Sequence, residues 1–247
     1  MYHIGVDEAG RGPMIGPLVV AAIAIPKKDL GLLKENNITD SKKLSPKKRN
    51  LAFRQIEKFI DERGWIKHIT ICNPINIDFA MESSNLNILE TELFANSINN
   101  LNIDFLNEGK LILDACDVNQ ERFGERVTNL VNKWPWDSWE LISIHGADNI
   151  HRSVGAASII AKVTRDNIIK EIEKDVGINI GSGYPSDPTS KKALYELCKG
   201  DVPNNCLRWN WASIRNHWEK EKGAKVPKRD YNKIDRGLTS QYRLSDY

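Results

Sequence analysis

The chain has 247 residues, of which 40% are hydrophobic and 28% are charged, and this balance is typical of a globular protein with one sizeable core. The formal net charge of +2 is too small either to indicate a nucleic-acid partner or to oppose one. Because the longest apolar stretch is too short to span a bilayer and the four cysteines lack C-x-x-C spacing, we expect a reduced cytoplasmic protein with neither a membrane segment nor a zinc site.

Apolar periodicity and turn residues predict the secondary structure in chain order. The first half is predicted to contain strands at 2–8 and 17–25, a helix at 46–62, a strand at 65–72, a helix at 84–100 and a strand at 109–116. The second half is predicted to contain a helix at 121–134, a strand at 139–148, a long helix from Val154, and helices at about 188–199 and 209–221. Strands that come early and helices that follow predict an α/β or α+β sheet domain with C-terminal helices.

The C-terminal segment differs from the rest of the chain in composition. Residues 223–247 contain six Lys or Arg and three Asp and have little apolar content. We therefore expect one folded domain over residues 1–222 and a mobile basic tail over residues 223–247.

Four acidic residues come at or near the C-terminal ends of predicted strands: Asp7, Glu8, Asp114 and Asp148. Carboxylates at strand ends can meet at one edge of a sheet, where cations must offset their repulsion. Ligands that are all oxygen favour Mg²⁺ or Mn²⁺ over zinc. Neighbouring residues of a strand point to opposite faces, so we expect Asp7 or Glu8 to leave the pleat. The alternative is that each acid is an ordinary solvated surface residue.

The first acidic pair is followed by a turn with Gly10, Gly12 and Gly16. This spacing differs from the G-x-G-x-x-G pattern of dinucleotide-binding proteins, and a strand rather than a helix follows it. A turn without side chains would instead let main-chain groups approach a nucleic-acid sugar, with Arg11 available for a phosphate.

Seven motifs together resemble type 2 ribonuclease H, also called ribonuclease HII, in its archaeal-like form. They are GVDEAGRGPMIGPLVVAA (5–22), DSKKL (40–44), LNILE (86–90), LILDACD (111–117), HGAD (145–148), AASIIAKVTRD (156–166) and SGYPSDP (182–188). The resemblance implies a ribonuclease-H-like fold with a central mixed five-stranded sheet flanked by helices and a C-terminal helical extension. It also implies a monomeric endonuclease that hydrolyses the RNA strand of RNA–DNA hybrids. The enzyme would also incise 5′ of ribonucleotides embedded in duplex DNA and leave 3′-hydroxyl and 5′-phosphate ends. These activities would serve DNA replication and repair, with association with the nucleoid during replication.

The resemblance also assigns site residues. Asp7, Glu8, Asp114 and Asp148 would be the catalytic carboxylates and hold two Mg²⁺ or Mn²⁺ ions. The main chain of Gly10, Arg11 and Gly12 would read the ribose 2′-hydroxyl, Tyr184 would stack on the neighbouring deoxyribose, and Lys42 and Asn87 would contact phosphates. Two departures from the family pattern, Gly146 and Gly155, touch none of the acids but bear on substrate affinity and metal preference.

The last seven residues suggest a protein partner. Gln241, Leu244 and Tyr247 fit Q-x-x-L-x-x-aromatic, most of the pattern that binds a sliding clamp. The sequence leaves two alternative functions open. One is another nuclease of the ribonuclease-H-like group, such as a resolvase or exonuclease, and the other is a non-catalytic hybrid-binding or clamp-associated adaptor.

Overall fold

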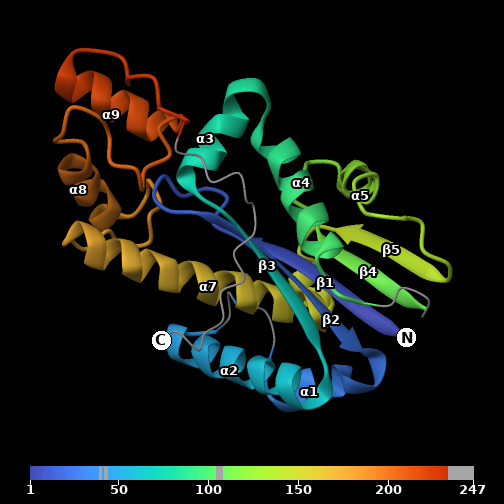
Figure 1. Cartoon of the computed structure of the whole chain (residues 1–247). Helices are drawn as coiled ribbons and strands as arrows, with labels where there is room; N and C mark the ends of the chain where they lie inside the picture. Colours follow the sequence, from blue (N-terminus) through green and yellow to red (C-terminus); the bar gives the residue numbers. More distant parts are fainter. Residues whose placement is uncertain (39–40, 42–43, 104–107, 233–247) are drawn as a thin grey trace.

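The computed structural model describes residues 1–38, 41, 44–103 and 108–232 (Figure 1). Its strands are β1 (Tyr2–Ala9), β2 (Leu18–Pro26), β3 (Ile66–Cys72), β4 (Gly109–Asp114) and β5 (Trp139–Ile144). Its helices are η1 (Lys27–Asp29), α1 (Leu30–Glu35), α2 (Pro46–Arg63), α3 (Pro74–Ser83), α4 (Leu86–Asn99), α5 (Gln120–Thr128), α6 (Ala147–Ile150), α7 (Arg152–Val176), α8 (Pro188–Leu197) and α9 (Ala212–Lys222). Within the described ranges, none of the helices is long and apolar enough to cross a membrane.

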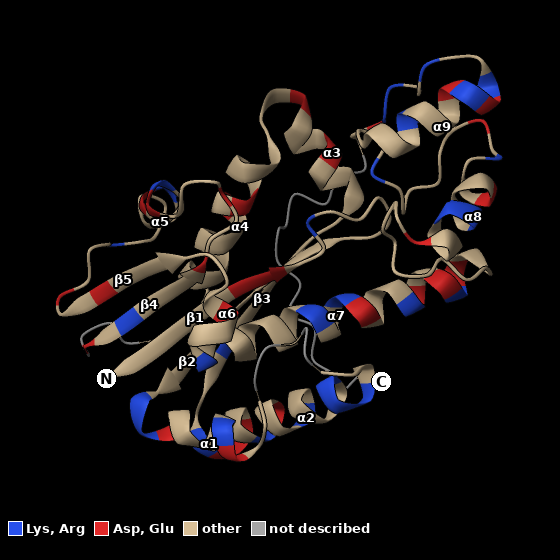
Figure 2. Cartoon of the chain, turned by 180° about the vertical axis from the view of Figure 1, so that it is seen from behind, with Lys and Arg blue, Asp and Glu red and all other residues tan. Residues whose placement is uncertain are grey.

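The strands form one mixed sheet in the order β3-β2-β1-β4-β5. β2 pairs antiparallel with both β1 and β3, whereas β1 with β4 and β4 with β5 are parallel pairs. The mixed five-stranded sheet expected from the family resemblance is therefore confirmed. This topology places β1 at the centre, so the acidic pair near its end lies in the middle of the molecule, where Figure 2 shows a red band on the strand.

Helices cover both faces of the sheet (Figure 1). Alternate residues of β2 enter two separate cores: Val20 and Ala22 pack with Phe94 of α4, whereas Val19 and Ala21 pack with residues of α2 and α7. A strand buried on both faces needs apolar residues at every position, which explains the continuous apolar run of β2. We name the two faces of the sheet by the helices that cover them: the α4 face and the α7 face.

A third apolar cluster joins the glycine turn to the C-terminal helices. Met14 and Ile15 of the turn are fully buried among residues of α8 and α9, including Leu194 and Trp218, and among residues from the end of α7 such as Ile169. The C-terminal helices are therefore part of the same packed body as the turn, and they determine where the turn lies.

The structure corrects several sequence-based boundaries. β5 ends at Ile144, and Asp148 lies in the separate short helix α6 instead of at a strand end. α9 begins at Ala212, because residues 207–211 form a loop that binds the glycine turn. The helices α1 and α3 were not predicted.

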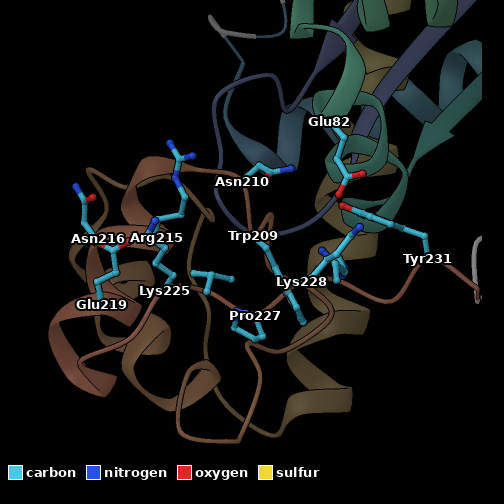
Figure 3. Close-up of a pocket in the computed structure, with 12 residues that line it drawn as sticks. Glu82, Trp209, Asn210, Arg215, Asn216, Glu219, Lys225, Pro227, Lys228 and Tyr231 are labelled. Carbon is cyan, nitrogen blue, oxygen red and sulfur yellow. The ribbon is translucent and has the colours of Figure 1, made fainter.

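The packed structure continues past the expected boundary at residue 222. Arg229 is buried and forms an ion pair with the fully buried carboxylate of Asp78 in α3. Arg229 also donates to the carbonyl of Leu207 at 2.9 Å. Residues 225–229 and Tyr231 line a pocket of about 520 Å³ between α3 and α9, where Tyr231 points towards Glu82 (Figure 3). The first part of the expected mobile tail is thus attached to the body.

Candidate metal centre and nucleic-acid interface

Three of the four predicted carboxylates meet at one point. The last paired residues of the parallel β1–β4 ladder are Val6 and Leu113, so Asp7 and Asp114 follow as neighbours on the same face. Asp148 reaches the same point from α6. One oxygen of each of the three carboxylates lies within 4.8 Å of the other two. Asp7 and Asp148 are buried, which makes this group unlike solvated surface acids.

Glu8 lies on the other face of the sheet. The β1–β2 ladder continues through Glu8 to Ala9, so neither acid leaves the pleat, and the expectation that one would do so is wrong. Asp7 therefore faces α7, whereas Glu8 falls in a second group of possible ligands with Glu90 of α4 and Cys116. The structure thus brings Asp7, Asp114 and Asp148 together and places Glu8 behind them.

The electrostatics favour the group of three aspartates as the cation site. Burial, and after it the negative charges of Asp114 and Glu8, raises the pKa of Asp7 well above its usual range. Burial also raises the pKa of Glu8, although the positive charge of Arg11 opposes the increase. A divalent cation would relieve this repulsion, and carboxylate oxygens are the ligands that Mg²⁺ and Mn²⁺ prefer.

The second group is less suited to a cation. The guanidinium of Arg11 already forms an ion pair with the buried carboxylate of Glu90. Burial and the charges of Glu8 and Asp7 raise the pKa of Cys116 well above its usual range, so its sulfur stays a neutral thiol, which is a poor ligand.

Hydrogen bonds orient Asp7 and Asp114. The hydroxyl of Ser158 in α7 bonds to Asp7, and the Oγ of Ser41 lies 2.8 Å from that of Ser158. The amide of Ala147 donates to Asp114 at 3.1 Å. Because these donors come from α7 and α6, the helices on this face hold the carboxylates that the strands present.

The glycine turn and the tyrosine loop are packed against each other. Gly10 has a φ of +98°, and a Cβ at this position would lie 2.4 Å from Nε of Arg165. A Cβ on Gly12 would lie 3.3 Å from the ring of Tyr184, which is 39% exposed. Side chains larger than hydrogen would therefore push the turn away from its neighbours.

Arg11 and Asn87 contact each other. Nη2 of Arg11 donates to Oδ1 of Asn87 at 2.8 Å, so both groups predicted to bind phosphate have a protein partner. Together with the ion pair to Glu90, this bond fastens the turn to α4. Lys42 of the predicted phosphate contacts, and Gln241, Leu244 and Tyr247 of the predicted clamp motif, lie outside the described residues.

Comparisons with known proteins agree with the motifs. A sequence model of the family Ribonuclease HII matches residues 4–214. Ribonuclease HII of Methanococcus maripaludis is 41% identical over 229 residues, which are 90% of each chain. The crystal structure of ribonuclease H2 from Pyrococcus horikoshii matches with a TM-score of 0.76 and 36% identity over 89% of this chain and 98% of that one. The structure of a PCNA:RNase HII complex from Archaeoglobus fulgidus matches with a TM-score of 0.72 and 29% identity over 100% of both chains.

Proposed function

The chain belongs to the ribonuclease HII family, and on this premise we propose how its site carries out and directs cleavage. It is an endoribonuclease that hydrolyses the RNA strand of RNA–DNA hybrids, built on a ribonuclease-H-like fold. We propose further that the enzyme incises 5′ of single ribonucleotides in duplex DNA and leaves 3′-hydroxyl and 5′-phosphate ends. Such cleavage would serve ribonucleotide and primer removal. The aspartate cluster beside the glycine turn is the observation that carries the proposal.

Asp7, Asp114 and Asp148 would hold Mg²⁺ or Mn²⁺, with Glu8 as the fourth ligand of a two-ion site. Ions bound there would activate a water and stabilise the leaving 3′-oxygen of an in-line displacement. The chain supplies the orientation: α7 positions Asp7 through Ser158, and the start of α6 positions Asp114 through an amide. The rise in the pKa of Asp7 supports this role, because burial and the charges of Asp114 and Glu8 cause it, and a bound cation would offset that repulsion.

Recognition would come from the turn and its neighbouring loop. The exposed main chain at Gly12 can approach the ribose 2′-hydroxyl, the group that distinguishes RNA from DNA. Tyr184, which lies against Gly12 and remains partly exposed, would stack on the deoxyribose that follows. The selected unit is therefore a ribonucleotide joined to a deoxyribonucleotide.

Three duplexes of one sequence test the proposal in Mg²⁺ and in Mn²⁺: an RNA–DNA hybrid, a DNA duplex with one ribonucleotide, and an all-DNA duplex. We expect cleavage of the first two and none of the third, and loss of cleavage in Asp114→Asn. Cleavage of the all-DNA duplex at a similar rate would favour a resolvase or exonuclease. Tight binding without cleavage in either metal would favour a non-catalytic adaptor.

The tail motif supports a second proposal, a sliding clamp as partner. The similar Archaeoglobus fulgidus protein is described in complex with PCNA, and Gln241, Leu244 and Tyr247 of this chain fit most of a clamp-binding pattern. Deleting residues 241–247 should weaken binding to the clamp and leave cleavage of a free oligonucleotide unchanged. Equal clamp binding after the deletion would refute this proposal.

A further inference from the structure

Two side chains of the loop before α9, Arg208 and Trp211, bind the main chain of the glycine turn. The fully buried Arg208 donates to the carbonyls of Gly10 at 2.5 Å and Arg11 at 2.9 Å. The indole Nε1 of Trp211 donates to the carbonyl of Gly12 at 3.3 Å. Three successive carbonyls of the turn are therefore held by the segment from Arg208 to Trp211.

The bond from Arg208 to the carbonyl of Arg11 determines the direction of the N–H of Gly12. The carbonyl of Arg11 and the N–H of Gly12 belong to the same trans peptide, so they point in opposite directions. Because Arg208 draws the carbonyl inward, the N–H of Gly12 points away from the interior. Gly12 is exposed, and among the described residues the structure records no acceptor for its amide. The turn thus presents an oriented hydrogen-bond donor to solvent.

Arg208 is held at a considerable electrostatic cost. It lies near a second buried arginine, Arg165, which donates to the carbonyls of Ile15 at 3.1 Å and Ser182 at 3.3 Å. Burial and the charge of Arg165 lower the pKa of Arg208 to about 9. Neither guanidinium has a carboxylate within 4.0 Å in the described part of the chain. Two buried cations without such a partner oppose folding unless carbonyl groups solvate them. The main chain of the turn provides this solvation, so the arginines and the turn stabilise each other.

We propose that Arg208 is a positioning residue for ribonucleotide selectivity, which aims the amide of Gly12 at the ribose 2′-hydroxyl. This inference rests on the proposed function. The 2′-hydroxyl can accept a hydrogen bond, and deoxyribose has no atom to do so. Loosening the turn should therefore weaken binding of a ribonucleotide, whereas contacts to phosphates remain.

The test is the affinity for a duplex with one ribonucleotide divided by the affinity for the matched all-DNA duplex, with cleavage blocked by Asp114→Asn. Lysine keeps the charge of Arg208 but has no planar fork for several carbonyls. Arg208→Lys should lower this ratio about tenfold, the effect of one lost hydrogen bond, with little change in the all-DNA affinity. Trp211→Phe keeps an aromatic ring and removes the N–H that binds the carbonyl of Gly12, so it should lower the ratio less than Arg208→Lys. If Arg208→Lys fails to fold, Trp211→Phe provides the test in its place.

Arg229→Lys is the matched control, since Arg229 is also buried, binds main-chain carbonyls and stacks on a tryptophan, but does not contact residues 10–12. It should leave the ratio unchanged even if it lowers the melting temperature. An unchanged ratio in both Arg208→Lys and Trp211→Phe, or an equal decrease in Arg229→Lys, would overturn the inference. If Asp114→Asn alone shows no preference for the ribonucleotide, the proposed function itself fails.

Discussion

Gly12 lies against the ring of Tyr184, with space for a hydrogen atom but not for a relaxed methyl group between them. The two residues come from segments far apart in the sequence. Main-chain bonds from the amides of Met14 and Ile15 to the carbonyl of Gly183, at 2.8 and 3.3 Å, join these segments. The turn and the tyrosine loop therefore form one surface, and a substitution that moves one of them should also move the other.

This contact predicts how Tyr184 contributes to cleavage. Tyr184→Ala should lower kcat/KM on the single-ribonucleotide duplex about tenfold through lost stacking, and Tyr184→Phe, which keeps the ring, should retain most activity. The long hybrid should respond less, because most of its cleavage sites have no RNA-to-DNA junction. Steady-state kinetics on both substrates measure the effect. Equal losses on the two substrates would argue that Tyr184 only supports the turn.

The buried carboxylates of Asp7 and Glu8 predict how the stability of the metal-free protein depends on pH. The pKa of Asp7 is raised above the ordinary 3.8 and that of Glu8 above 4.5. Each group therefore contributes stability that is present below its ordinary pKa and is lost as pH rises through the raised value. In chelator, the free energy of unfolding in urea should fall as pH rises above the ordinary carboxyl pKa of about 4.

The variant Asp7→Asn isolates this effect. It cannot ionise at this position, so its unfolding free energy in chelator should fall less steeply with pH than that of the wild type, while cleavage in Mg²⁺ is abolished. Parallel pH curves for the two proteins would mean that Asp7 is not repelled by its neighbours.

The hydroxyl of Ser158 predicts a shift of the cleavage pH profile. Its bond to Asp7 favours the ionised carboxylate and lowers the pKa of that group. Ser158→Ala should therefore move the acid limb of kcat/KM to higher pH and weaken Mg²⁺ binding. Ser41→Ala is the control, since Ser41 contacts Ser158. It should shift the limb less, and a shift of the same size would assign the effect to general loosening of this region.

The ion pair between Asp78 and Arg229 predicts an effect on stability at a place remote from Asp7, Asp114 and Asp148. Asp78→Ala leaves the guanidinium of Arg229 buried without its counter-charge, and we expect a loss of about 3–5 kcal/mol in unfolding free energy. Ser83→Ala, at an exposed residue of the same helix, should cost far less. Denaturant unfolding measures both, and similar small losses would show that residues 223–232 do not depend on this pair.

The sequence predicted the site best where an acidic residue follows a clear apolar strand pattern and also belongs to a family motif. Asp114 ends β4 and Asp7 lies near the end of β1, and both strands have clear apolar patterns, so the two residues meet through the parallel pairing of β1 with β4. Alternation along β1 also predicted that Glu8 and Asp7 point to opposite faces. The error was to expect a break in the pleat, because the pairing of β1 with β2 continues to Ala9.

Other parts of the site carry no local signal. The sequence connected Asp148 with the other acids through a predicted strand end, whereas the residue comes from the separate helix α6. Arg208 was not singled out in the sequence, because hydropathy does not distinguish a buried arginine from a solvated one. Its role follows from carbonyl groups almost two hundred residues earlier in the chain, which only the folded structure brings to it. Glu90 was missed as the partner of Arg11 for the same reason.

The most direct test of the metal centre is the anomalous scattering of crystals grown with Mn²⁺. We predict density among the carboxylates of Asp7, Asp114 and Asp148, and its loss in Asp148→Asn. Density confined to the group of Glu8, Glu90 and Cys116, or no bound ion at a Mn²⁺ concentration that supports cleavage, would contradict the account.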